Sequence, residues 1–271
     1  MRGAIIGDII GSAFIESPKP ITEIQLLKPS SAYTDDTILT LAMADAVLNH
    51  KPYEIALREW VRLFPKAGYK QDFLNWALSD KHHSEYDSQG DGAARRISPI
   101  GFSAHSLEDA IEEAQKATYV THASKDKIKG AQLVAGSIFL AKEGHSKEQI
   151  GRFLSDQSEF EVNPTNFRNH VKMIANKHNT PVPFALLAFF DSTNFEDALR
   201  KAIAIGGPTN TIASITGALA QAYYKHIPKC FIRKTLSRVE PVMNTLIKQF
   251  EAYYFNDQIQ SGQRALKFVY A

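Results

Sequence analysis

The chain has a single cysteine, Cys230, among its 271 residues. One thiol cannot form a disulfide within the chain, so a small secreted scaffold held together by disulfide bonds is excluded. A lone cysteine is typical of proteins from reducing compartments. The sequence therefore predicts a cytoplasmic location.

Long uninterrupted apolar runs are also missing. A membrane-spanning helix needs about 20 consecutive apolar residues, and no stretch of the chain approaches this length. The N-terminal segment MRGAIIGDIIGSAF resembles a signal peptide, because Arg2 precedes an apolar run, but Asp8 interrupts that run. We interpret the segment as a helix and expect no membrane partner.

An excess of charge of one sign is absent as well, because the formal net charge is only +2 at pH 7. So small a charge gives no long-range attraction for nucleic acid, which we exclude as a partner. Hydrophobic residues make up 44% and charged residues 22%, an ordinary globular composition. Without a repeat, a low-complexity tract or a linker, residues 1–271 are predicted to form one domain.

Strand-like alternation of apolar and polar residues is missing, whereas apolar residues recur at spacings of three and four along most of the chain. The predicted class is all-α, with about ten helices. Polar N-cap residues mark helix starts, and glycine or proline marks their ends. The predicted N-caps are Ser106, Ser146 and Asn194, and the predicted stops are Gly144, Gly206, Gly207 and Pro228.

The segment Ser79–Pro99 has the weakest helical pattern, because it is polar and contains Gly90 and Gly92. Irregular stretches of this length in compact domains are often functional, and we predict an ordered loop here. Its glycines expose backbone amides which, with Arg95 and Arg96, would suit a phosphate. Similar loops are common on surfaces that bind nothing, so the loop alone favours a surface without a ligand.

Asp8 lies among isoleucines on the predicted N-terminal helix. Gly3, Gly7 and Gly11 recur every four residues there, so they share one face and allow another backbone to approach closely. A buried carboxylate needs partners, since burying it alone costs several kcal/mol. Asp8 either orients a neighbouring helix or takes part in a site.

Thr34, Asp35, Asp36 and Thr37 open a helix that is apolar on nearly all sides. One aspartate there is explained by capping and by the helix dipole. The second adds a repulsion between like charges that a hard cation would relieve. Both interpretations stay open, and capping is the simpler.

Five motifs follow one another along the chain: GAIIGDIIGS, TDDT, GDGAARRISPIG, THASKDKIKGA and GGPTNTIASITGALAQAYY. In this order and spacing they resemble the ADP-ribosylglycohydrolase family, also called dinitrogenase-reductase-activating glycohydrolases, from Gly3 to about Tyr224. The resemblance implies a compact orthogonal helical bundle that binds ADP-ribose beside two magnesium ions and cleaves the glycosidic bond to the distal ribose. ADP-ribose or a related nucleotide, and an ADP-ribosylated protein, are the partners it implies.

By this resemblance the site residues fall into three groups. The implied catalytic residues are Asp35, Asp36 and Glu16; the implied ligand-binding residues are Gly90, Asp91, Gly92, Arg96, Thr121 and His122; and the implied metal ligands are Thr34, Asp35, Asp36, Asn210 and Thr211.

Several of the chemical positions depart from the family pattern. Pro208 and Asn210 replace two metal-ligand aspartates, and Glu16 lies one residue later than the family's glutamate, which turns a helical side chain by roughly 100°. In the glycine loop, Asp91 replaces an asparagine and Arg95 replaces a methionine. An aspartate would repel a diphosphate, so either Arg95 offsets its charge or the ligand differs from ADP-ribose.

Magnesium prefers about six oxygen ligands and is held poorly without carboxylates or phosphates. Asp35 and Asp36 supply too little negative charge for two magnesium ions, so we expect at most one weakly held Mg²⁺, or none. Three functions stay open: a hydrolase that works with one metal or none, a pseudoenzyme that binds a nucleotide or a protein without cleaving it, and a structural protein without a ligand.

Overall fold

The computed structural model describes residues 1–15, 24–79, 86–88, 90–158 and 180–255. Within these ranges all regular secondary structure is helical, with fourteen α-helices, one short 3-10 helix and no strand. The all-α prediction is confirmed. None of the helices in these ranges is long and apolar enough to cross a membrane.

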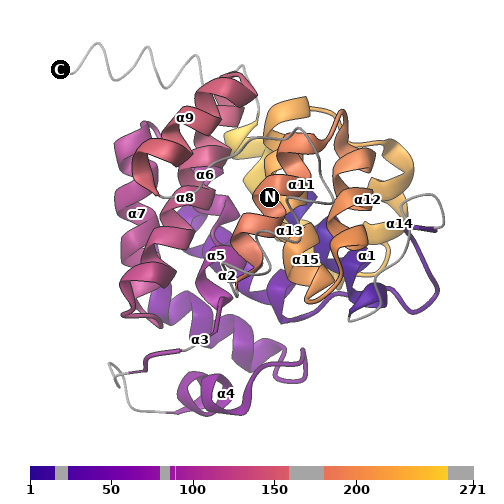
Figure 1. Ribbon diagram of the computed structural model, residues 1–271. Helices are drawn as coiled ribbons and strands as arrows, with labels where there is room; N and C mark the ends of the chain where they lie inside the picture. The colour runs from indigo at the N-terminus through magenta and orange to yellow at the C-terminus, as the bar shows by residue number, and fades with distance from the viewer. Residues whose placement is uncertain (16–23, 80–85, 89, 159–179, 256–271) are drawn as a thin grey trace.

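Four helices lie at the centre of the bundle (Figure 1): α1 (Arg2–Gly11), α2 (Asp35–Asn49), α8 (Lys125–Lys142) and α13 (Thr209–Tyr224). Most of their side chains are buried on every face, which explains why they are apolar nearly all round. The core therefore consists of helices surrounded by other helices.

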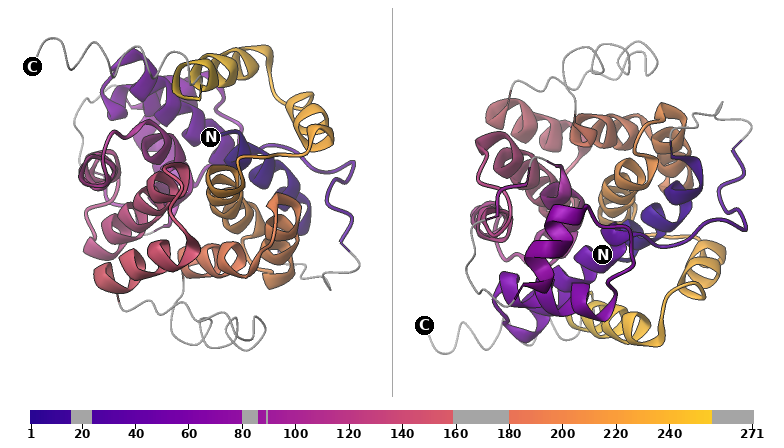
Figure 2. Two further views of the ribbon diagram at one scale, coloured as in Figure 1. Left: turned by 90° about the horizontal axis from the view of Figure 1, so that it is seen from above. Right: turned by 90° about the horizontal axis from the view of Figure 1, so that it is seen from below.

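The remaining helices cover this centre on several sides (Figure 2). The short 3-10 helix η1 (Ser12–Phe14) continues α1, and α3 and α4 lie at one end of the bundle in Figure 1. The bounds of the covering helices are α3 (Tyr53–Leu63), α4 (Gln71–Leu78), α5 (Gly92–Arg96), α6 (Ser98–Ser103), α7 (Leu107–Tyr119), α9 (Lys147–Gln157), α11 (Pro181–Asp191), α12 (Phe195–Ile205), α14 (Lys229–Leu236) and α15 (Pro241–Tyr254).

The predicted helix starts are confirmed. Ser106 and Asn194 cap α7 and α12 by accepting a hydrogen bond from the third backbone N–H of the helix. Ser146 caps α9 in the same way, and Gln149 returns a hydrogen bond to its backbone. These reciprocal bonds satisfy amides that would otherwise lack a partner at the helix start.

The predicted helix ends are confirmed at the glycines but not at Pro228. Gly144 and Gly206 follow α8 and α12 with φ of +89° and +83°, a backbone region that favours glycine. Helix α13 ends at Tyr224, because Lys225 turns into the left-handed region three residues before the proline.

The prediction of a loop over Ser79–Pro99 was wrong in its last third. Residues Gly92–Arg96 form α5, and α6 begins at Ser98. Ala93 and Ala94 are buried, so packing against the core and the high helix propensity of alanine and arginine outweigh the polar pattern. Residues 80–85 and 89 of this segment lie outside the described part of the chain.

The closest helix pair is α1 with α13, and glycine makes it possible. A β-carbon on Gly7 would overlap the backbone carbonyl of Ala213, and one on Gly3 would overlap that of Gly217. Gly217 in turn lies against the carbonyl of Gly3. The four-residue glycine spacing therefore brings two backbones into direct contact, as the sequence indicated.

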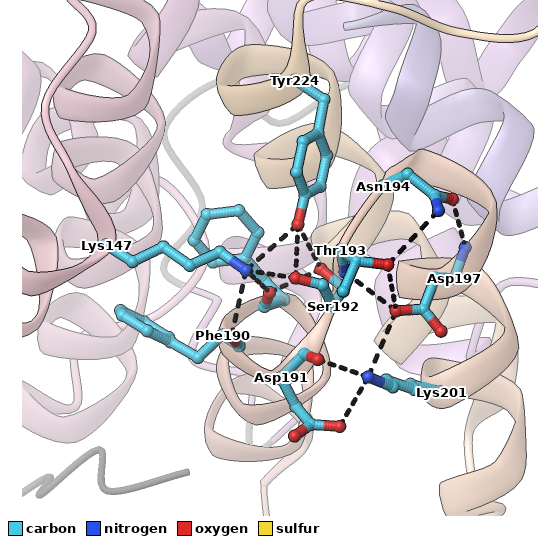
Figure 3. A network of polar contacts seen from close by, with 10 residues as sticks. Lys147, Phe190, Asp191, Ser192, Thr193, Asn194, Asp197, Lys201 and Tyr224 are labelled. Carbon is cyan, nitrogen blue, oxygen red and sulfur yellow. Dashed lines mark hydrogen bonds and ion pairs between the residues drawn. The ribbon is translucent and has the colours of Figure 1, made fainter.

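The partly buried ammonium group of Lys147 joins α9, α11 and α13 (Figure 3). The Nζ of Lys147 donates to the carbonyls of Phe189, Phe190 and Ser192 at 2.8, 3.0 and 2.5 Å, and it lies 3.0 Å from the hydroxyl of Tyr224. The carbonyls of Phe189 and Ser192 also accept from Ser192 and Tyr224, so the ammonium group adds a donor to a helix end that is already capped. Lys147 therefore acts as an additional C-cap supplied by another helix.

Replacing Gly7 by alanine should destabilise the protein by about 3 kcal/mol, because α1 and α13 would have to separate to admit the methyl group. Urea unfolding measures the change. Gly151→Ala in α9 is the matched control, since a β-carbon there meets its nearest neighbour, a ring atom of Phe190, at 3.7 Å. That control should be neutral or slightly stabilising; equal losses for both variants would contradict the packing argument.

Candidate functional site

Asp8 fastens the start of α2 to α1. Its carboxylate accepts hydrogen bonds from the backbone N–H of Thr34 and Thr37 at 2.9 and 3.2 Å, and from their hydroxyls at 2.7 and 2.6 Å. Asp8 is fully buried, and four donors with the positive end of the α2 dipole compensate for its charge. Of the two interpretations of Asp8, orientation of a neighbouring helix matches these contacts.

Asp35 and Asp36 follow immediately and face Arg95 from α5. One guanidinium nitrogen lies 2.6 Å from an Asp35 oxygen, and the other forms an ion pair with Asp36. Burial raises the pKa of Asp36, whereas the adjacent guanidinium opposes that rise. Arg95 is therefore the counter-ion of both carboxylates, and of the two alternatives for Asp91 the one in which Arg95 offsets its charge does not match these contacts.

The start of α13 completes the polar cluster. Thr211 donates its hydroxyl to Asp36 at 2.8 Å, and the side-chain amide of Asn210 lies 3.2 Å from the same carboxylate oxygen. That amide also donates to the Thr34 hydroxyl at 3.3 Å. The predicted metal ligands thus lie together: hydrogen bonds join Thr34, Asp36, Asn210 and Thr211, and Asp35 is linked to them through Arg95.

A cleft of about 860 Å³ runs beside this cluster, lined by Lys70, Asp91, Lys127, Pro181 and other residues. A smaller pocket of about 200 Å³ shares Lys70, Asp91 and Pro181 with the cleft, so the two lie side by side. The small pocket is lined at its inner end by Asp35, Arg95, Arg96, His122 and Thr211. The glycine loop, with Gly90 and Gly92, contributes to its wall.

The family model described as ADP-ribosylglycohydrolase matches residues 1–258. The chain belongs to the ADP-ribosylglycohydrolase family. It is 25% identical to ADP-ribosylhydrolase ARH3 of Xenopus tropicalis, over 83% of this chain and 85% of that protein. It is 23% identical to ADP-ribosylarginine hydrolase Tri1 of Pseudomonas putida (strain GB-1), over 83% and 69%.

A solved structure described as an ADP-ribosylglycohydrolase-related protein complex superposes with a TM-score of 0.70 at 21% identity, covering 93% of this chain and 94% of that one. This likeness confirms the predicted orthogonal bundle of the ADP-ribosylglycohydrolase type.

The residues present do not fit the pair of magnesium ions that resemblance to the family implies. Magnesium needs oxygen ligands with free lone pairs, but Asp35 and Asp36 direct their oxygens at the guanidinium of Arg95. Asn210 presents its NH₂ group, which is a donor and cannot be a ligand. In the described part of the chain, no three His, Cys, Asp or Glu side chains are arranged to hold a metal ion.

Asp91, the aspartate of the glycine loop, is neutralised by a lysine. The Nζ of Lys127 on α8 lies 2.7 Å from its carboxylate. Lys70 adds a second positive charge, because its Nζ would lie 3.3 Å from a β-carbon placed on Gly90. The repulsion expected between Asp91 and an anionic ligand is therefore reduced by two lysines.

A chain of three buried side chains leads to the small pocket. The guanidinium of Arg96 donates to the carbonyl of Ala117 at 3.1 Å and to the hydroxyl of Thr121 at 2.7 Å, and that hydroxyl lies 2.8 Å from Nδ1 of His122. Because the Thr121 oxygen already accepts from Arg96, its own proton is best used toward Nδ1. His122 then carries its proton on Nε2, a buried atom that forms no hydrogen bond of good geometry in the described part of the chain and has the backbone of Gly90 as its polar neighbour.

The neutral form of His122 suits this assignment. Burial, together with the nearby positive charges of Arg96, Lys127 and Arg95, lowers the pKa of His122 to about 3. A neutral imidazole with its proton on Nε2 offers the small pocket one hydrogen-bond donor. The pocket is thus prepared for an oxygen acceptor, such as a hydroxyl or a phosphate oxygen.

Two lysines of the site were not predicted from the sequence, and one predicted residue lies outside the described part of the chain. The sequence reading did not single out Lys70 and Lys127, since single lysines in polar segments carry no distinguishing signal. Glu16 lies outside the described residues. The catalytic, ligand-binding and metal roles of the other predicted residues stay predictions, although the structure brings those residues together.

His122→Gln should reduce the loss of stability in mild acid. Below pH 6.5 the unfolded chain protonates its histidine while the folded chain does not, so acid favours unfolding. Between pH 7.5 and 5.5 the unchanged protein should lose about 1.4 kcal/mol more than the variant. Urea unfolding at the two pH values measures this difference, and an equal loss in both proteins would rule out a neutral, buried His122.

Proposed function

We propose that the cleft binds an ADP-ribose-type ligand and that the chain does not hydrolyse it. The observation that carries the first part is the pair of adjacent cavities, both lined by Gly90 and Asp91, of which the smaller is also lined by His122. Membership of the ADP-ribosylglycohydrolase family supports the ligand class. Relatives named as ADP-ribosylhydrolase and ADP-ribosylarginine hydrolase support it too.

The charges along the cleft support a diphosphate beside the glycine loop. Gly90 and Gly92 leave space for an anion to approach the backbone, and Lys70 lies on the same wall. Lys127 cancels the charge of Asp91, which would otherwise repel phosphates. In this arrangement the distal ribose enters the small pocket and offers a hydroxyl oxygen to the imidazole of His122.

The contacts of Arg95 favour binding without hydrolysis. Glycoside hydrolysis commonly needs a carboxylate that activates water, and Asp35 and Asp36 are both engaged by the guanidinium. The alternative, a working hydrolase, draws support from the names of the relatives and would use Asp35, Asp36 or Glu16. A weakly held Mg²⁺ or an ADP-ribosylated protein as partner belongs to that alternative.

Isothermal titration calorimetry with ADP-ribose, together with release of ADP-ribose from arginine- and serine-linked peptides, tests both parts. We expect binding and no release above that of an Asp35→Ala, Asp36→Ala double variant. Lys127→Ala should weaken binding about tenfold, because Asp91 loses its partner. Lys125→Ala is the matched control, since Lys125 is exposed on the same helix, and it should bind as the unchanged protein does.

Two outcomes would contradict the proposal in different ways. Release of ADP-ribose above the double variant would show a working hydrolase. Absence of any heat or thermal stabilisation with ADP-ribose, NAD or ADP at millimolar concentration would leave the structural alternative.

A further inference from the structure

Arg95 occupies the place in the pocket where the carboxylates of α2 converge. Its guanidinium reaches Asp35 and Asp36 at once, and it comes from α5, sixty residues away in sequence. Asp36 is completely buried, whereas about a fifth of the Arg95 side chain is exposed toward the pocket. One fixed cation therefore lies between the buried carboxylates and the cavity.

Among the described residues, the oxygens of these two carboxylates already have donors: Asp35 pairs with Arg95, and Asp36 pairs with Arg95 through one oxygen and with the α13 side chains through the other. The second oxygen of Asp36 accepts from Thr211 and faces the amide of Asn210. A divalent ion placed between the carboxylates would meet the positive charge of Arg95 at contact distance. Binding it would require the arginine to leave both of its partners.

Arg95 is also not needed as the counter-ion of Asp91. Asp91, the other carboxylate on this loop, has Lys127 as its own counter-ion at 2.7 Å. The Nε of Arg95 is buried and has no hydrogen-bond partner in the described part of the chain. Together with Nε2 of His122 it lies near Gly92, and a β-carbon there would be 3.7 and 3.5 Å from the Arg95 Nε and the His122 ring.

We propose that Arg95 is the resident cation of this pocket: its guanidinium takes the place of divalent metal ions between Asp35 and Asp36, and its Nε–H is left to donate to an oxygen of the bound ligand. Metal exclusion follows from the ion pairs alone. The donor role of Nε rests on the proposed function, because it needs a ligand in the pocket.

Binding of Mn²⁺, used as a probe for divalent ions, tests metal exclusion without any ligand. In electron paramagnetic resonance titrations the unchanged protein should bind no Mn²⁺ at 1:1 stoichiometry up to about 1 mM, whereas Arg95→Met should bind at least one ion, with a Kd at least tenfold lower than any residual binding. Arg95→Lys keeps the charge and should not bind. The triple variant Arg95→Met, Asp35→Asn, Asp36→Asn should lose the acquired site.

The Mn²⁺ titration of the unchanged protein tests metal exclusion even if the Arg95→Met variant does not fold. Stoichiometric Mn²⁺ in the unchanged protein, lost on Asp35→Asn, would overturn the proposal. A folded Arg95→Met variant, checked by circular dichroism, that binds no Mn²⁺ would also overturn it.

Titrations with ADP-ribose distinguish a failure of this proposal from a failure of the proposed function. The Kd for ADP-ribose should change less than twofold between 5 mM EDTA and 5 mM MgCl₂, and Arg95→Lys, which keeps the charge but moves the donor, should weaken binding about tenfold. A Kd that falls at least tenfold on adding magnesium would contradict the replacement of metal by Arg95. If ADP-ribose does not bind at all, the proposed function and the donor role fail, while the Mn²⁺ titration still decides metal exclusion.

Discussion

The backbone contact between α1 and α13 positions the rest of the candidate site. Glycines on both helices remove the β-carbons that would hold the helices apart, and the hydroxyl of Thr209 donates to the carbonyl of Gly11 at 2.8 Å where α13 begins. The beginning of α13 is thus fixed beside the end of α1. Since Asp8 of α1 also holds the beginning of α2, two helix starts meet at one point.

The side chains at these helix starts determine the chemistry of the pocket. Asp35 and Asp36 bring two negative charges into a place with little access to water, and a cation must compensate for them. A tethered guanidinium does so at every metal concentration and without the entropy cost of capturing a free ion. It also occupies the carboxylate oxygens that would hold a metal or activate water. The family fold is retained, and in the proposal above a guanidinium takes over the charge compensation that metal ions would provide.

The sequence was sufficient for features that depend on neighbouring residues or on helical spacing. The all-α class, the caps at Ser106, Ser146 and Asn194, and the close approach through Gly3 and Gly7 are of this kind. The motif order led to the family, which the match over residues 1–258 shows. The cytoplasmic location and a single domain over residues 1–271 stay predictions.

Side-chain contacts between residues far apart in the chain could not be predicted from the sequence. Three acidic residues were available to Arg95, and only the placement of α5 against α2 decides for Asp35 and Asp36 over Asp91. Lys127, 36 residues from Asp91, had no pattern to distinguish it from other lysines of the segment. The short helix α5 was missed because its two buried alanines follow a polar, glycine-containing stretch.

The most direct test of the central claim, that Arg95 supplies the positive charge between Asp35 and Asp36, is a crystal structure of the protein grown with ADP-ribose and 10 mM MnCl₂. Anomalous scattering from manganese would locate any bound ion. The account predicts no anomalous peak within coordination distance of Asp35 and Asp36, with the guanidinium of Arg95 still between them. One or two ions bound to these carboxylates, with Arg95 displaced, would contradict it.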